Sequence, residues 1–215
     1  TLPFNGGISI MSDSQNYVKT AIKNLNKLDR LIKSQKLDEA LEIASAAYDI
    51  LKDSTEKIKF AEACSYIAEI WFKKADFQKA YQFYNEAAGA CVELLISDLA
   101  INYLKNAISC LQYEDNAATI IKKVDESVSI ARPVAYKHEI GSLLSIGGNI
   151  LFNKRAWNDA LTYFIQSFEL GGSTLQRASE SLYNVISICF FKICKWVDSI
   201  LNGKVVLGLV DIYRN

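Results

Sequence analysis

The chain has 215 residues with 24 basic and 24 acidic side chains, so its formal net charge is zero, and half of its residues are hydrophobic. This composition excludes an intrinsically disordered chain, which combines low hydrophobicity with high net charge. The balanced charge also argues against a protein that binds nucleic acid or an anionic membrane through a general excess of basic residues. Only two prolines interrupt the chain, which favours long helices.

The sequence indicates no membrane span and no secretion signal. The most hydrophobic stretch, residues 185–197, is interrupted by Lys192 and Lys195 and is shorter than the roughly 20 residues that a transmembrane helix needs. Residues 1–12 lack the basic region and apolar core of a signal peptide and are interpreted as an N-terminal arm or a vector remnant. Five cysteines without a C-x-x-C pair indicate buried thiols in a reducing compartment. We therefore expect a cytoplasmic protein, with peripheral attachment to membranes left open.

A short pattern recurs at intervals of about 40 residues, and internal repeats of this length are typical of stacked helix hairpins. Each copy has a large apolar residue, two polar residues, a small residue and a second apolar residue. The small residues are Ala40, Ala80, Ala160 and Ser199, with a weaker copy at Ala117.

Each copy begins a helix that follows another helix. Between residues 55 and 74, for example, apolar side chains recur with the period of an amphipathic helix. Asp76 is suited to cap the next helix, and Pro133 fits the first turn of a later one. The predicted pairs are 14–34 with 37–51, 55–74 with a helix running through residue 88, and 133–153 with 157–170. The sequence thus predicts an all-α fold, a right-handed α-solenoid of about five antiparallel hairpins over residues 13–202.

The repeated small residues have a packing role in this prediction. Antiparallel helices approach closely where they cross, which requires a small side chain at the crossing, and larger side chains fill the space beside it. The predicted packing residues are Ala40, Ala80, Tyr84, Ala160, Phe164 and Ser199.

Residues 144–151, followed by Ala160, Phe164 and Ser167, resemble the two helices of the tetratricopeptide (TPR) repeat. A second copy runs from Cys64 through Trp71 to Ala80, Tyr84 and Ala87. The step here is longer than the family's step of about 34 residues, and the terminal proline is missing. Longer hairpins of this kind are similar to those of the soluble NSF attachment proteins (SNAPs), the adaptors of vesicle fusion.

The resemblance implies a partner-binding surface, because the first helix of each TPR-like hairpin lines a concave face that binds a peptide or helix. The matching positions are Ser65, Glu69, Phe72, Lys73, Ser145, Asn149, Phe152 and Asn153. For each of these residues, the alternative to partner binding is an ordinary solvent-exposed position on the wall of the groove. The Lys and Asn pair that binds peptide carboxylates in some TPR proteins is replaced by Ser65 and Glu69, which disfavours an acidic chaperone tail as the ligand.

Lys19, Lys23, Lys27 and Lys33 follow one side of the first predicted helix. They form either a surface for an acidic partner or an ordinary solvated face.

Little in the sequence suggests catalysis. His138 is the only histidine, and no nucleotide-binding loop, G-x-S-x-G or H-E-x-x-H motif is present. We expect no enzyme activity, no cofactor and no metal site.

The C-terminal part is unusually apolar for the end of a solenoid, which normally has a polar outer face. Residues 183–213 are interpreted as a homodimerisation surface, with the tail 203–215 folding back, or further chain covering this surface, as alternatives. The self-association candidates are Ile186, Phe190, Phe191, Trp196, Leu207 and Tyr213.

The predicted function is a non-catalytic scaffold or adaptor that binds a peptide or helical partner on its concave face. One alternative is a SNAP-like adaptor in membrane trafficking. In that family an apolar N-terminal loop touches the membrane, and residues 4–8 resemble this loop. An acidic C-terminal tail of the family engages an ATPase, and residues 211–215 do not match this tail. The other alternative is a regulator that senses a peptide or small ligand.

Overall fold

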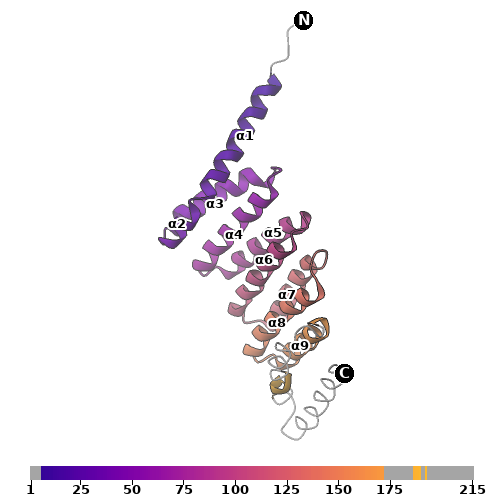
Figure 1. Ribbon diagram of the computed structural model, residues 1–215. Helices are drawn as coiled ribbons and strands as arrows, with labels where there is room; N and C mark the ends of the chain where they lie inside the picture. The colour runs from indigo at the N-terminus through magenta and orange to yellow at the C-terminus, as the bar shows by residue number, and fades with distance from the viewer. Residues whose placement is uncertain (1–5, 172–185, 190–191, 193–215) are drawn as a thin grey trace. The chain divides into compact units, whose positions relative to one another are not determined.

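The computed structural model describes residues 6–171, 186–189 and 192, and side chains from residue 15 onwards within these ranges. All regular secondary structure in this part of the chain is helical, so the all-α prediction is confirmed (Figure 1). No helix among the described residues has the length and hydrophobicity needed to cross a membrane. The elements are α1 (Gly6–Leu25), α2 (Leu28–Lys33), α3 (Leu37–Lys52), α4 (Lys57–Lys73), α5 (Phe77–Glu93), α6 (Ser97–Cys110), the 3₁₀ turn η1 (Leu111–Tyr113), α7 (Ala117–Ala131), α8 (Lys137–Asn153) and α9 (Trp157–Gly171).

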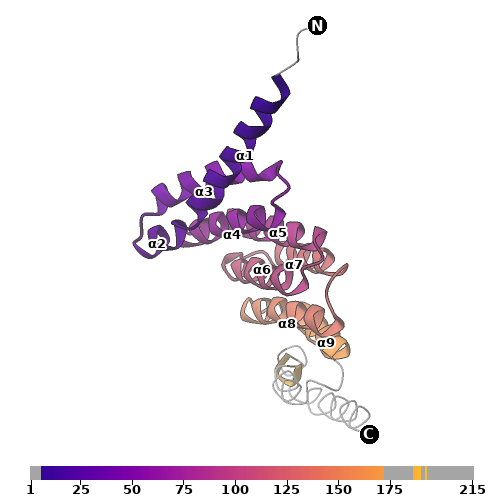
Figure 2. The same ribbon diagram turned by 45° about the horizontal axis from the view of Figure 1, so that its top comes forward.

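The chain divides into two compact units, Thr1–Tyr103 and Leu104–Asn215, with the boundary inside α6. In the first unit, α3 packs against α1, α2 and α4, and α4 packs against α5. In the second unit, α8 packs against both α7 and α9. Figure 2 shows α4 beside α5 and α8 beside α9, each pair joined by a tight turn.

The helices from α3 onwards begin at even intervals. Each begins 20 residues after the one before it, at Leu37, Lys57, Phe77, Ser97, Ala117, Lys137 and Trp157. The second helices of the hairpins, α3, α5, α7 and α9, therefore begin in steps of 40 residues.

Four tight turns share one backbone conformation. Ala75, between α4 and α5, has a φ of 61°, and the corresponding residues Gln35, Leu95 and Arg155 have φ values of 60°, 58° and 65°. At Ala75 the turn is closed by N–H donors of Ala75 and Asp76, which bond to the carbonyls of Phe72 at 3.0 Å and Trp71 at 2.9 Å. This is the Schellman arrangement that satisfies the last carbonyls of a helix, here formed without glycine.

The small residues of the repeated pattern lie in the core. Ala40, Ala80 and Ala160 are each the fourth residue of a helix and are fully buried, as is Phe164. Tyr84 is partly exposed. Ser199 lies outside the described residues.

The third copy of the pattern has a different register from the predicted one. Ala117 is the first residue of α7, and Ile120 occupies the fourth, fully buried position. The reason is the cap: the Asn116 side chain accepts a hydrogen bond of 3.1 Å from the Thr119 N–H, so α7 begins three residues later than the pattern suggested. With this correction the fourth positions are Ala40, Ala80, Ile120 and Ala160.

Two glycines allow α8 to lie close to its neighbours. A Cβ at Gly147 would stand 2.9 Å from Cγ1 of Val124 on α7, and a Cβ at Gly148 would stand 2.8 Å from Cε1 of Phe164 on α9. Both distances are too short for real carbon contacts, because carbon atoms pack at 3.5 to 4.0 Å. Two neighbouring faces of α8 thus lie close to α7 and α9 because glycine has no side chain.

Two predicted helix boundaries were wrong. The helix expected over 14–34 is two helices, separated at Asn26 and Lys27, where the Lys27 N–H bonds to the Asn24 carbonyl three residues back. Pro133 lies in the link before α8, not in its first turn, because α7 ends at Ala131 and a proline N cannot donate the hydrogen bond that would extend it. The predicted cap at Asp76 is confirmed: its carboxylate accepts from the Lys79 N–H at 3.1 Å.

Candidate partner-binding surfaces

Three of the predicted partner-binding residues form a polar row on α4. Ser65, Glu69 and Lys73 are four residues apart, which places them on one face of the helix, and all three are at least partly exposed. Ser65 Oγ donates to the Glu62 carbonyl at 2.8 Å, and Lys73 Nζ lies 3.7 Å from Glu69 Oε1. The row is open to solvent and presents both a cation and an anion.

The equivalent row on α8 is uncharged. Ser145, Asn149 and Asn153 occupy the positions 80 residues further along the chain, and the two asparagines are exposed. Asparagine side chains carry both donors and acceptors, so this row can pair with the backbone of an extended or helical segment.

Phe72 and Phe152 have a different role from the polar residues beside them. The Phe72 ring packs edge-on against Phe77 with centroids 5.4 Å apart, and the Phe152 ring packs in the same way against Trp157 at 4.9 Å. Each pair spans a tight turn and joins the end of one helix to the start of the next. These two phenylalanines therefore help to close their hairpins, and a partner would meet only their exposed edges.

A third row was not predicted from the sequence. Lys105, Ser109 and Tyr113 lie 40 residues after the α4 row, on α6 and η1. All three are at least partly exposed, with 51% exposure at Tyr113. The 40-residue step between helix starts was the signal that could have identified them, but the shifted register at Ala117 obscured it.

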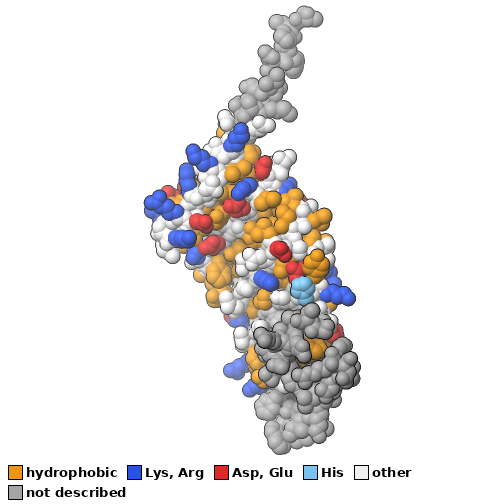
Figure 3. Space-filling view, in the orientation of Figure 1, with side chains coloured by type: hydrophobic (Ala, Val, Ile, Leu, Met, Phe, Trp, Pro, Cys, Tyr) orange, Lys and Arg blue, Asp and Glu red, His pale blue; other side chains and the backbone are white. Residues whose placement is uncertain are grey.

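Basic side chains gather on α1 and α2. Figure 3 shows Lys and Arg side chains along this edge of the first unit. We call Lys19, Lys23, Lys27, Arg30 and Lys33 the basic surface, and all five are exposed. Four of them are the predicted lysine stripe, which the break between α1 and α2 divides between two helices; Arg30 is an addition.

Two tyrosines, the partly exposed Tyr48 and the buried Tyr163, link helices through acidic partners. Tyr48 on α3 donates to Glu86 on α5 at 2.8 Å, and Tyr163 on α9 donates to Asp125 on α7 at 2.8 Å and to the Ile121 carbonyl at 3.2 Å. Burial is the main cause that raises the pKa of both phenols, and the neighbouring carboxylates raise it further. These pairs fix helix packing and are not poised to exchange protons near neutral pH.

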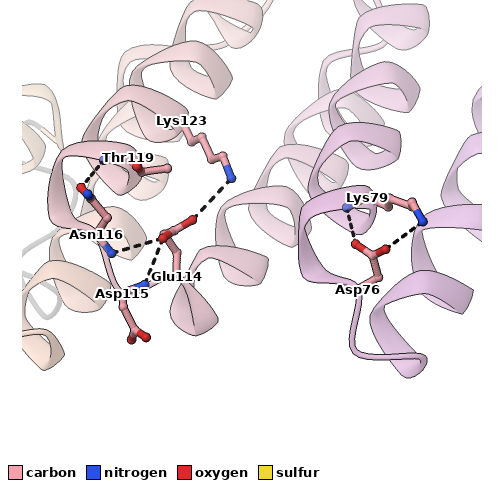
Figure 4. Close-up of polar contacts among 7 residues, drawn as sticks. All are labelled: Asp76, Lys79, Glu114, Asp115, Asn116, Thr119 and Lys123. Carbon is pink, nitrogen blue, oxygen red and sulfur yellow. Dashed lines mark hydrogen bonds and ion pairs between the residues drawn. The ribbon is translucent and has the colours of Figure 1, made fainter.

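Charged side chains at two of the turns form short-range hydrogen bonds and ion pairs (Figure 4). The Asp76 carboxylate lies 2.9 Å from Lys79 Nζ, and the Glu114 carboxylate accepts from the N–H groups of Asp115 and Asn116 at 3.1 and 3.2 Å. Two ion pairs connect residues further apart in the sequence. Lys74 at the end of α4 pairs with Asp38 at the start of α3, and Lys154 at the end of α8 pairs with Asp115 just before α7.

The described cysteines are protected thiols. Cys64, Cys91, Cys110 and Cys189 are free and buried, and burial raises the pKa of Cys91 to about 11 and of Cys110 to about 12. A thiol in this state is a poor nucleophile and a poor metal ligand.

His138 is exposed and stacks on Tyr136, with ring centroids 5.9 Å apart.

One self-association candidate falls within the described residues. Ile186 is buried, with 6% of its surface exposed. The other candidates lie outside the described part of the chain: Phe190, Phe191, Trp196, Leu207 and Tyr213. The proposed dimer surface over residues 183–213 and the predicted fifth hairpin lie mainly outside it as well.

Comparison with known proteins adds a likeness of fold. No protein-family model and no curated protein matches the chain. Among solved structures, the crystal structure of BtubC (BKLC) from P. vanneervenii matches with a TM-score of 0.54 and 9% sequence identity, over 92% of this chain and 92% of that one. At this identity the likeness concerns the fold alone.

Proposed function

We propose that this chain is a non-catalytic scaffold or adaptor that binds a peptide or helical segment of another protein along the exposed rows of α4, α6 and α8. The observation that carries the proposal is the recurrence of these rows. In each of the three helices, side chains four residues apart stay at least partly exposed at equivalent positions. The second helices instead use their recurring fourth residue for the core. A polar row kept open in successive hairpins suits recognition of an elongated ligand.

The same proposal includes the architecture. A right-handed, TPR-like α-solenoid with a 40-residue repeat accounts for helices that begin every 20 residues, and hairpins stacked in this way leave their first helices available to a ligand. In this proposal the first helices line the concave face.

A SNAP-like adaptor in membrane trafficking is the second candidate. The observation that favours it is the length of the hairpins, because the 40-residue step exceeds the step of about 34 residues of ordinary TPR proteins.

Affinity capture with matched variants tests the binding role. The row variant carries Lys73→Glu, Asn149→Arg and Asn153→Arg. The control carries Lys122→Glu, Gln82→Arg and Gln166→Arg at exposed positions of α5, α7 and α9, so both variants have the same net charge. Both are used as bait in native lysate, and bound proteins are quantified by mass spectrometry.

The proposal expects a partner that the wild type and the control capture and that the row variant loses by about tenfold or more. Equal capture by all three proteins would overturn it. Circular dichroism and urea unfolding of each bait show that a loss does not come from unfolding.

A further inference from the structure

The basic surface is a local charge excess in a chain whose total charge is zero. Residues 15–36 contain six basic side chains and one acidic side chain, Asp29, which gives this segment a net charge of +5. Residues 1–103 as a whole contain 12 basic and 14 acidic side chains, and Asp38, Glu39 and Glu42 lie on α3, which packs against α1 and α2. The charge excess is therefore a property of the segment itself and not of the whole first unit.

The cations of the basic surface are not used within the described structure. Among the described residues, an ion pair forms at Lys36, whose Nζ lies 3.3 Å from Glu39 Oε2, but none forms at the five residues of the basic surface. Lys27 Nζ donates only to the neutral side chain of Asn24, at 3.1 Å. The one carboxylate within the segment, Asp29, lies close to Tyr66, whose pKa is raised to about 12, first by burial and then by this charge. The basic surface is thus available to an external anion.

The side chains around the cations of α1 and α2 indicate which kind of anion can bind there. Within residues 15–33, the part of α1 and α2 whose side chains the structure describes, the apolar residues Ala21, Leu25, Leu28 and Ile32 are buried, at 3% exposure or less. A helix that binds a membrane surface needs a free apolar face beside its cations, and here the large apolar side chain exposed on the described part of α1 is Tyr17 alone. Single-stranded nucleic acid, which stacks its bases on several aromatic rings, is disfavoured for the same reason.

The cations of the basic surface are closely spaced along each helix. Lys19 and Lys23 are four residues apart, about 6 Å along α1, and Arg30 and Lys33 are three residues apart, about 4.5 Å along α2. Cations at this spacing match carboxylates placed at similar intervals on a polypeptide. Lysine and arginine side chains on such a line pair with aspartate and glutamate and accelerate association through long-range attraction.

We propose that the basic surface binds an acidic segment of a partner protein. This site is separate from the exposed rows of α4, α6 and α8, so it does not depend on the proposed function. Occupation of the basic surface would add a second, salt-sensitive contact to a partner or would recruit a different protein.

The test uses a fluorescein-labelled peptide of alternating Glu and Ala blocks, about 20 residues long, which spans ~30 Å as a helix. A second peptide has Gln in place of every Glu. Fluorescence anisotropy measures binding of both peptides to the full chain at low and high salt. The basic-surface variant is Lys19→Gln, Lys23→Gln and Arg30→Gln. The matched control is Arg132→Gln, Lys137→Gln and Arg155→Gln, which removes three exposed cations from the second unit.

We expect the acidic peptide to bind the wild type and the control alike, and the basic-surface variant about tenfold more weakly, because exposed ion pairs are individually weak and act together. Binding falls with salt, and the Gln peptide does not bind. Three results would overturn the proposal: no binding of the acidic peptide, an equal loss in the control, or tighter binding of phosphatidylserine vesicles or a double-stranded DNA oligonucleotide than of the peptide. If the wild type does not bind the acidic peptide but still captures a partner through the exposed rows, this proposal fails and the proposed function does not.

Discussion

Gly148 on α8 lies directly against the ring of Phe164 on α9, so close that a Cβ at position 148 would stand 2.8 Å from Cε1 and 3.0 Å from Cδ1 of that ring. Phe164 is fully buried and has no room to withdraw. The pair explains why a helix that packs on two neighbours contains a residue that is otherwise unfavourable in a helix interior.

Gly148→Ala is expected to destabilise the fold by about 1–3 kcal/mol, because the new methyl group overpacks a filled core. Gly89→Ala on α5 is the control. Nothing lies within 4 Å of a Cβ at that position, so alanine should stabilise the helix by about 0.5–1 kcal/mol. Urea unfolding followed by circular dichroism measures both. Two changes of the same sign would contradict the close packing at Gly148.

Leu95→Gly is expected to stabilise the protein by about 0.5–1 kcal/mol. Leu95 has a φ of 58°, a left-handed conformation that is costly for a residue with a Cβ, and its side chain is 76% exposed, so little burial is lost. Gln82→Gly, within α5, should destabilise by a similar amount. A higher urea midpoint for Leu95→Gly is the expected result, and a midpoint at or below that of the wild type would show that the turn has another conformation.

Tyr163→Phe is expected to lower stability by about 1–2 kcal/mol near neutral pH, because it leaves Asp125 and the Ile121 carbonyl without their phenol donor. Burial, with Asp125 as a further cause, holds the pKa of Tyr163 above its ordinary value of 10.0 in the folded state. The stabilisation from the neutral phenol is therefore complete below pH 10 and is lost as the pH rises from there towards the folded pKa.

The difference in unfolding free energy between wild type and Tyr163→Phe should accordingly narrow above about pH 10. Urea titrations at a series of pH values measure it. Tyr17→Phe, which removes a hydroxyl from an exposed side chain, is the control and should leave stability near neutral pH unchanged. A difference for Tyr163→Phe that stays constant into the alkaline range would argue against the hydrogen bond between Tyr163 and Asp125.

Lys154→Ala is expected to raise the pKa of Asp115 towards its ordinary value of 3.8, because the hydrogen bond and charge of Lys154 hold it lower in the native protein. The contribution of this pair is present at neutral pH and is lost as the pH falls through the folded pKa of Asp115. Carbon-detected NMR titration of the carboxylate measures the shift. Asp76, whose pKa is lowered by Lys79, serves as the internal reference and should not change.

The helical fold could be predicted because the local signals agree with it. The apolar period between residues 55 and 74, the Asp76 cap and the buried small residues Ala40, Ala80 and Ala160 all indicate hairpins, and the structure contains these elements. The third hairpin was harder to align, because its crossing position carries Ile120 in place of a small residue. The Asn116 cap was the signal that fixes its register.

The candidate site was only partly predictable. Helical spacing was sufficient to select residues such as Glu69 on α4 and Asn149 on α8, each of which is at least partly exposed on its own helix. It could not show that Phe72 turns its ring to Phe77 across the tight turn, because that contact depends on the path of the chain beyond the helix end. Likewise, the lysine stripe was visible in the sequence, but the absence of ion pairs at the basic surface is a property of the folded residues that the structure describes.

Binding along the exposed rows is tested most directly by photo-crosslinking from single sites. A benzophenone amino acid is placed at Asn149 on α8 or, as control, at Gln166 on α9; both positions are exposed and belong to the same hairpin. After irradiation in native lysate, crosslinked peptides are identified by mass spectrometry. We expect a defined segment of one partner protein to crosslink at position 149 and not at 166. Crosslinks that are absent at 149, or equal at both positions, would contradict a partner-binding role for these rows.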